Sequence, residues 1–224
     1  MKLHIVEIPK LALQRRASAA LGLIIMVMLW AGVFYAYRSD VQEDFREVEL
    51  RNQNYSLLFE ENVLRSIGEI DKSLLYLRRT VEAAKDSTEF QTIVMTTDVL
   101  SEIIVQVAII DAQGISRGSN ARPQPTGRID ISDREHFRVH VNSTDDSLFI
   151  SKPVVGRASG KWSVQFTRRF LNQDGRFAGI VVASMDPAHF TSFYDKIDLG
   201  ATTSVAMVGS DGVVRSAGGG AVAR

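Results

Sequence analysis

Residues 17–37 form a run of twenty-one residues without a charged side chain, and no other feature limits the possible folds of this chain as strongly. At 1.5 Å per residue, a helix of this length spans about 31 Å, which matches the ~30 Å hydrocarbon core of a membrane. Trp30, Tyr35 and Tyr37 lie toward its C-terminal end, where aromatic rings favour the membrane interface. The run therefore predicts a transmembrane helix over 17–37.

The charges on either side of this run predict its orientation. Lys2, Lys10, Arg15 and Arg16 precede it, whereas the arginines that follow it are mixed with acidic residues. This excess favours a cytoplasmic N-terminal tail over 1–16 and an external remainder. The alternative is a cleaved signal peptide, although the run is longer than the usual apolar region of about 7–15 residues and no small-x-small cleavage site follows it.

Overall composition excludes several classes of function. The 26 Lys and Arg residues balance 26 Asp and Glu residues, so nothing favours nucleic acid as a partner. The chain has no cysteine, which removes disulfides, thiolate catalysis and Cys-ligated zinc.

The segment 38–85 reads as one long external helix. It contains no proline, and its apolar residues recur at steps of three, four or seven from Val41 to Val81. A helix of about 70 Å cannot bury such a stripe against one small domain. We therefore expect residues 40–60 to pair with a second copy of the chain, and residues 61–84 to pack on their own domain. Packing of the whole helix on its own domain is the alternative.

After residue 85 the pattern changes to a period of two, which predicts an α+β fold with a five-stranded antiparallel sheet. The strand 177–185 is apolar on both faces and belongs at the centre, while 162–167 alternates between an apolar and a polar face. A capping box, Ser132 to Glu135, begins one of the helices. The expected helices are 88–104, 132–140 and 187–197, and the expected strands are 105–110, 115–117, 148–157, 161–170 and 177–185.

One internal repeat is present. Residues 107–117 align with residues 205–215 at an offset of 98, with identical Val, Ala, Gly and Arg positions. A second module of the same kind is therefore expected to begin within 201–224. A lone hairpin cannot close a core. We expect the sequence to be a fragment of a longer protein, or else its last twenty residues to be poorly ordered.

An ordered series of short segments completes the pattern: 131–137 (ISDREHF), 149–157 (FISKPVVGR), 159–162 (SGKW), 167–169 (TRR), 174–179 (DGRFAG) and 182–186 (VASMD). With the helices and the repeat, the series resembles the double Cache sensor domains of bacterial membrane receptors, which have a PAS-like sheet. The resemblance covers about residues 40–217 and is to the membrane-distal module that precedes diguanylate cyclases and sensor histidine kinases. It implies a place in the bacterial inner membrane, a ligand-binding module over 86–200 and a cytoplasmic output domain after the sensor. The pairing expected for residues 40–60 would make this receptor a homodimer.

The resemblance also implies candidate ligand-binding residues. Arg134, His136 and Phe137 stand where amino-acid-sensing relatives carry an Arg-x-Trp-Tyr motif that holds a carboxylate, and Asp186 stands where an aspartate holds an amine. His136 and Phe137 depart from that motif, which puts an amino acid ligand in doubt. Lys152 and Arg157 are further candidates.

Each of these candidates also has a structural interpretation. Arg134, Lys152 and Arg157 could form ion pairs on the surface, His136 could pack against a loop, and Asp186 could cap the helix that Pro187 begins.

The sequence therefore predicts the sensor portion of a membrane receptor that binds a small anionic or zwitterionic ligand carrying a carboxylate. No catalytic residue, metal site or cofactor is predicted, because the sequence has no nucleophile elbow and no phosphate loop. His136 and His140 have the i, i+4 spacing of metal ligands, but the glutamate of a metalloprotease helix does not accompany them. Three alternatives remain: a membrane-anchored external hydrolase, the sensor of a chemotaxis transducer, and a structural anchor whose PAS-like fold binds nothing.

Overall fold

The structure is a computed structural model that describes residues 10–84, 86–96, 104–121, 127–192 and 203–219. It divides into two compact units, with the boundary between Glu60 and Glu61. Helix α1 (Lys10–Ala83) contributes to both of them. Sequence analysis predicted a transmembrane helix and a separate external helix, but the two form one continuous helix. No proline occurs between residues 10 and 122, so nothing in this stretch removes a backbone donor from the helix.

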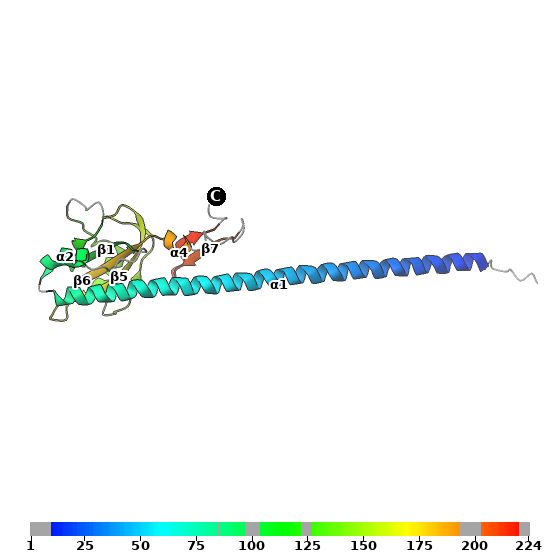
Figure 1. Cartoon of the computed structure of the whole chain (residues 1–224), viewed down its shortest axis with the longest axis horizontal. Coiled ribbons are helices and arrows are strands. Elements are labelled where there is room, and N and C mark those ends of the chain that lie inside the picture. Colours follow the sequence, from blue (N-terminus) through cyan, green and yellow to red (C-terminus); the bar gives the residue numbers. More distant parts are fainter. Residues whose placement is uncertain (1–9, 85, 97–103, 122–126, 193–202, 220–224) are drawn as a thin grey trace, which may run out of the picture. The chain divides into compact units, whose positions relative to one another are not determined.

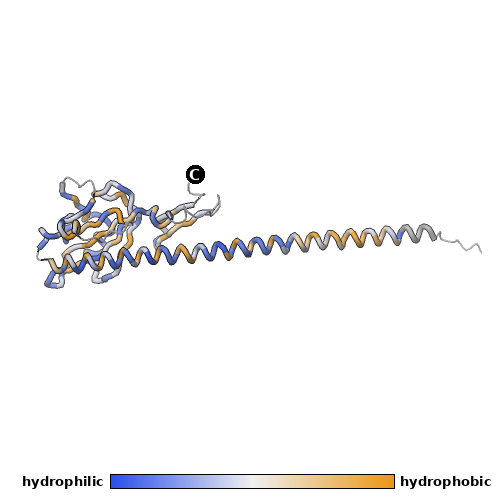
Figure 2. The backbone as a smooth tube through the Cα atoms, viewed as in Figure 1, coloured by the Kyte–Doolittle hydropathy of each residue, from blue (hydrophilic) through white to orange (hydrophobic). Residues whose placement is uncertain are grey.

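The first unit consists of helix α1 up to Glu60. Figure 2 shows its hydrophobic run as an orange stretch toward the N-terminal end of the helix. An 18-residue window of this helix has a mean hydropathy of 2.2, and none of the window is buried. Val41, Asp44, Phe45 and Val48 line a shallow apolar groove further along. The helix therefore presents both apolar stretches at its surface.

The second unit begins with the last part of helix α1, whose apolar stripe packs on a sheet. Ile70, Leu74 and Leu77 are almost fully buried there, as is Val81. This confirms the prediction that residues 61–84 pack on their own domain. Arg168 of the sheet adds an ion pair to Asp71 of the helix, with Nη2 donating to Oδ2 at 2.9 Å.

Among the described residues, the main sheet has six strands in the order β2-β1-β6-β5-β3, and β4 also pairs with β5. Figure 1 labels β1, β5 and β6 of this sheet. All pairs are antiparallel, and β6 lies at the centre between β1 and β5, as its apolar pattern predicted. The strands are β1 (Ile104–Asp111), β2 (Ser116–Ser119), β3 (Phe149–Ile150), β4 (Val154–Val155), β5 (Trp162–Leu171) and β6 (Phe177–Met185).

The expected strand over 148–157 is two short strands instead. β3 pairs with β5 at Thr167 and Phe166, and β4 pairs with β5 further along, at Ser163 and Trp162. Pro153 lies between the two strands and has no N–H to donate, so it interrupts the ladder. The expected five-stranded sheet thus has six strands in five positions.

The two faces of β5 are both covered. Val164 and Phe166 are fully buried on the α1 side, but Ser163, Gln165 and Thr167 on the opposite side are buried as well. The alternation predicted a polar face here, and the structure shows that this polar face is buried. Trp162 is 64% exposed, so it is not the core residue that its pattern favoured.

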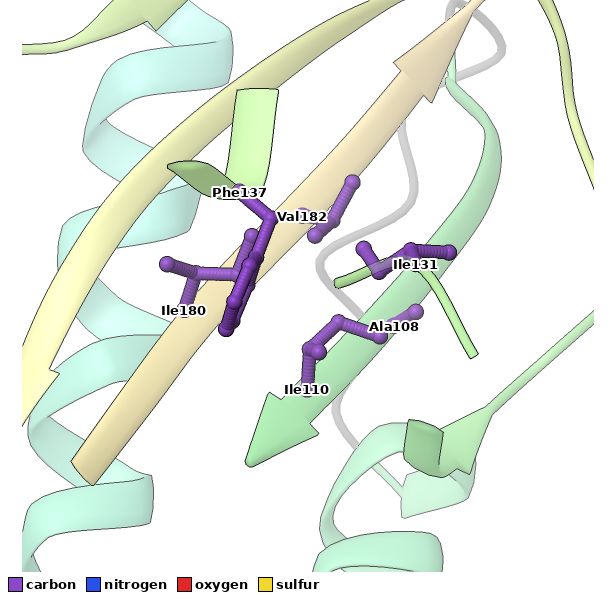
Figure 3. Close-up of a cluster of buried hydrophobic side chains, with 6 residues drawn as sticks. All are labelled: Ala108, Ile110, Ile131, Phe137, Ile180 and Val182. Carbon is purple, nitrogen blue, oxygen red and sulfur yellow. The ribbon is translucent and has the colours of Figure 1, made fainter. Parts of the chain in front are cut away.

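Helix α3 (Glu135–Val141) covers part of this second face. Its Phe137 packs on Ile180 and Val182 of β6, within a cluster that Figure 3 shows on one side of the sheet. The predicted capping box does not form. The N-cap is Arg134, without a side-chain cap, because Ser132 instead donates its backbone N–H to Asp130 in a turn.

The remaining helices lie where they were predicted, as far as the described residues reach. A 3-10 turn (Ser87–Glu89) precedes α2 (Phe90–Thr96), and α4 covers Ala188–Ser192. The rest of the predicted helices, residues 97–103 and 193–197, lies outside the described residues.

The two repeated segments form matching hairpins. In the first, Asp111 N donates to Ile115 O and Gly114 N donates to Asp111 O; 98 residues later, Gly209, Gly212 and Val213 make the same two bonds. Gly114 and Gly212 both have positive φ, 83° and 74°. The second hairpin, β7 (Val205–Val208) and β8 (Val214–Gly218), forms a separate two-stranded sheet.

Candidate functional site

A pocket opens on the face of the sheet opposite α1. Its floor comes from β1, β5 and β6, and its walls are the segments 129–136 and 154–158. The space between the floor and the walls, with the part open to solvent included, is about 470 Å³. The lining residues are Gln106, Ala108, Ile110, Ser116, Ile129, Ile131, Arg134, His136, Val154, Val155, Gly156, Arg157, Ala158, Gln165, Val182 and Ser184.

The polar groups of the floor are buried and held in place by hydrogen bonds. Ser184 Oγ donates to Gln165 Oε1 at 2.6 Å, and Gln165 Nε2 donates to Ser163 Oγ at 2.8 Å. On the neighbouring strand, Gln106 Nε2 donates to Ser119 Oγ at 3.0 Å. These side chains are neutral, so the floor can exchange hydrogen bonds with a ligand but cannot balance its charge.

Arg134 brings a positive charge to the pocket. It precedes the first turn of α3, and its Nη2 donates to the backbone oxygen of Val155 at 3.3 Å. Across the described ranges, no carboxylate lies within ion-pair distance of its guanidinium. Because a guanidinium offers five donors in a planar fork, Arg134 has donors left for a carboxylate or a phosphate.

Arg157, the second cation that lines the pocket, is already engaged. Its Nη1 and Nη2 donate to the two carboxylate oxygens of Asp133 at 2.7 Å each, and Nη1 also donates to the backbone oxygen of Asp130. This bidentate pair lowers the pKa of Asp133 and raises that of Arg157. Arg157 therefore connects the two walls of the pocket.

His136 is buried and lines the pocket without a charge. Burial, together with the nearby positive charge of Arg134, lowers the pKa of His136 to about 4. His140 lies on the same helix and is also buried, and this burial is the main reason that its pKa is lowered to about 4. Its Nε2 lies 2.8 Å from Thr167 Oγ1. Both imidazoles are neutral near pH 7. In the described part of the chain, no three His, Cys, Asp or Glu residues cluster as a metal site would require.

The other predicted ligand residues do not line this pocket. Phe137 belongs to the apolar cluster of Figure 3. Lys152 Nζ lies 3.9 Å from Glu135 and 3.8 Å from Asp211 in the turn of the second hairpin. Asp186 accepts the backbone N–H of Ala188 at 2.9 Å, which is the helix cap that its place before Pro187 allowed.

The structure brings together three residues that were predicted from the sequence: Arg134, His136 and Arg157. Three further lining residues were not predicted: Gln106, Gln165 and Ser184. A signal for these three existed, because each is a polar residue within a strand of mostly apolar neighbours. Such a residue in the middle of a buried sheet needs a polar partner, and a pocket supplies one.

Comparison with known proteins gives structural matches. No family model and no curated protein sequence matches the chain. The extracellular domain of a protein assigned as a histidine kinase, rpHK1S-Z16, is 28% identical with a TM-score of 0.53, over 69% of this chain and 62% of that one. The chain thus spans less than two thirds of that domain.

Chemoreceptor domains match at lower identity. The ligand-binding domain of Pseudomonas fluorescens CtaA, in complex with L-alanine, is 13% identical with a TM-score of 0.56, over 71% of this chain and 67% of that one. That of Pseudomonas aeruginosa PctC, an amino acid chemoreceptor in complex with GABA, is 16% identical with the same TM-score, over 71% and 70%. The fold is that of a Cache-like sensor domain.

In this Cache-like domain, the pocket lies between the sheet and the segments that cover it. The apolar stretch of α1 and the external location of the matched domains together indicate a membrane-anchored protein with an external sensor domain.

Proposed function

We propose that the chain is the N-terminal sensor part of a bacterial membrane receptor and that it binds a small carboxylate-bearing molecule in the pocket beneath Arg134. The observation that carries this proposal is the guanidinium of Arg134, which lines a pocket with a neutral polar floor and has no carboxylate partner among the described residues. A charge-assisted bidentate contact is the strongest interaction that such a site offers to a small molecule.

The matched chemoreceptor domains support this ligand class. Their structures contain L-alanine, L-serine and GABA, each of which carries a carboxylate. We assign His136 and Arg157 to the same site, His136 as a neutral hydrogen-bonding group and Arg157 as the residue that joins the walls. We assign no ligand contact to the other three candidates: Lys152 lies near Glu135, Phe137 packs in the apolar cluster, and Asp186 caps α4.

We assign the N-terminus to the cytoplasm and the Cache-like domain to the periplasm or the cell exterior, from the charge bias around 17–37. The membrane-near part of α1 would pair with a second copy, because the groove lined by Val41, Phe45 and Val48 has no cover within the described chain. Ligand binding would then shift the sheet against α1 and bias this dimer.

A second module and an output domain complete the proposal. The hairpin β7–β8 repeats the backbone bonds of β1–β2, which supports the start of a second Cache module within 201–224. The output would be a diguanylate cyclase or a histidine kinase, with a chemotaxis transducer as the alternative.

A melting-temperature screen of the purified chain against organic acids, amino acids and amines tests the ligand class. We expect carboxylates to raise the melting temperature and amines without a carboxylate to leave it unchanged. Stabilisation by amines alone would contradict the proposal. Turnover of generic ester, peptide or glycoside substrates would instead favour the external hydrolase.

A further inference from the structure

We infer that the pocket selects acids that lack an ammonium group and discriminates against α-amino acids. This inference rests on the proposed function, because it specifies which carboxylate-bearing molecules the pocket beneath Arg134 accepts. An α-amino acid brings two charges into a site, so the site must supply an anion for the ammonium as well as a cation for the carboxylate.

The lining of the pocket carries only one sign of charge. Arg134 and Arg157 are its charged members, and no Asp or Glu occurs among the described residues that line it. The polar remainder of the lining is neutral: Gln106, Ser116, Gln165, Ser184 and His136. An ammonium placed here would lose water, face a guanidinium and find no opposite charge.

The carboxylates in the neighbouring segments have partners of their own. Both oxygens of Asp133 accept from Arg157, and Asp130 accepts the backbone N–H of Ser132 at 2.9 Å. Glu135 lies near Lys152. Asp186 caps α4 and does not line the pocket.

The neutral groups of the floor suit a hydroxyl or a carbonyl group on the ligand. Gln106 uses its amide nitrogen on Ser119, which leaves its carbonyl oxygen as an acceptor, and Ser184 uses its hydroxyl hydrogen on Gln165, which leaves its oxygen as an acceptor. A hydroxyl can donate to one such acceptor without bringing a charge. A 2-hydroxy acid therefore fits the described lining better than an amino acid of the same shape.

Matched pairs of ligands test this selectivity directly, because each pair differs only in a hydroxyl or an ammonium at carbon 2. The pairs are lactate and alanine, glycerate and serine, and 2-hydroxy-3-methylbutanoate and valine. Each compound is titrated into the full 224-residue chain in detergent micelles, with the melting temperature and the Kd as readouts. We expect at least one hydroxy acid to bind with a Kd at least about tenfold lower than that of its amino acid.

The outcomes separate this inference from the proposed function. Equal or tighter binding of the amino acid in every pair that binds would overturn the selectivity and leave a carboxylate sensor. No binding by any member would overturn both.

The variant Asp133→Asn controls for the one carboxylate that an ammonium could reach by displacing Arg157. The preference for the hydroxy acid should persist in this variant. Amino acid binding that is present in the wild type and lost in Asp133→Asn would identify Asp133 as an ammonium partner and overturn the inference.

Discussion

Arg157 and Asp133 join the two walls of the pocket through a bidentate ion pair, with both N–O distances at 2.7 Å. The pair connects the segment 154–158 to the segment 129–136, the two walls of the pocket. Both side chains are partly exposed, and the pair therefore contributes little to stability. Its role lies in holding the walls together.

Asp133→Asn should therefore speed ligand exchange more than it destabilises the fold. We expect the free energy of unfolding to stay nearly the same, because an exposed ion pair contributes little to stability. Dissociation of a stabilising acid, measured by stopped-flow, should become several-fold faster. Arg157→Lys keeps the charge but loses the bidentate fork, and should show the same direction of change. An unchanged dissociation rate in both variants would show that the pair does not restrain the walls.

The ion pair between Arg168 and Asp71 should matter more for stability, because it is partly buried between β5 and α1. Arg168 is 11% exposed and Asp71 26%. Asp71→Asn removes the bidentate partner of the guanidinium and leaves it only the longer ion pair with Asp146, at 3.8 Å. We expect a loss of about 1.5–3 kcal/mol in urea unfolding.

The matched control for this prediction lies on the same helix. Arg65 and Glu61 form a pair at 2.9 Å, but both side chains are about two thirds exposed, at 65% and 68%. Glu61→Gln should cost less than about 0.5 kcal/mol. Equal losses in Asp71→Asn and Glu61→Gln would contradict the assigned role of the buried pair.

The buried histidines should make the fold less stable in mild acid. The pKa of His136 and of His140 is lowered to about 4 in the folded chain, below the unfolded value near 6.5. As the pH falls from 6.5 to 4, the unfolded chain binds these protons first, so the free energy of unfolding decreases, by roughly 2–3 kcal/mol per histidine.

Urea unfolding at pH 7.5, 5.5 and 4.5 measures this dependence. The double variant His136→Gln, His140→Gln should lose most of the slope between pH 6.5 and 4.5. A wild-type stability that is constant over this range would contradict the neutral state assigned to both rings.

The fold was largely readable from the sequence where local pattern and packing agree. The apolar stretch 177–185 predicted β6 at the sheet centre, and the repeat at an offset of 98 predicted the second hairpin. Pro153 indicates the break between β3 and β4, but the prediction of one strand over 148–157 did not take this proline into account. The capping box failed because the turn at Asp130 takes the backbone N–H of Ser132 before the helix begins.

The site was less predictable because its floor depends on contacts between distant segments. Arg134, His136 and Arg157 follow from short motifs, and the structure brings them together. The alternation of 162–167 indicated a polar face but could not say that α3 and the two walls cover it, so Gln165 and Ser184 were not singled out. Whether a polar strand residue faces solvent or a pocket is decided by what packs over it.

Self-association along α1 can be tested with single cysteines, since the chain has none of its own. Cysteine at Val41, Phe45 or Val48, in membranes, should cross-link between two copies under mild oxidation, because these residues line the exposed apolar groove. Cysteine at Glu43 or Glu47, on other faces of the helix, should cross-link far less. Equal cross-linking at all five positions would show that no specific seam exists.

The affinity of a stabilising acid for the wild type and for Arg134→Ala tests the central proposal most directly. A lost charge-assisted contact costs about 1.5–3 kcal/mol, so Kd should rise by roughly 10- to 150-fold. The melting temperature without ligand should stay nearly the same, because within the described residues the Arg134 side chain makes one long hydrogen bond, to Val155. Equal affinity of both proteins for the acid would contradict the assignment of this pocket as the ligand site.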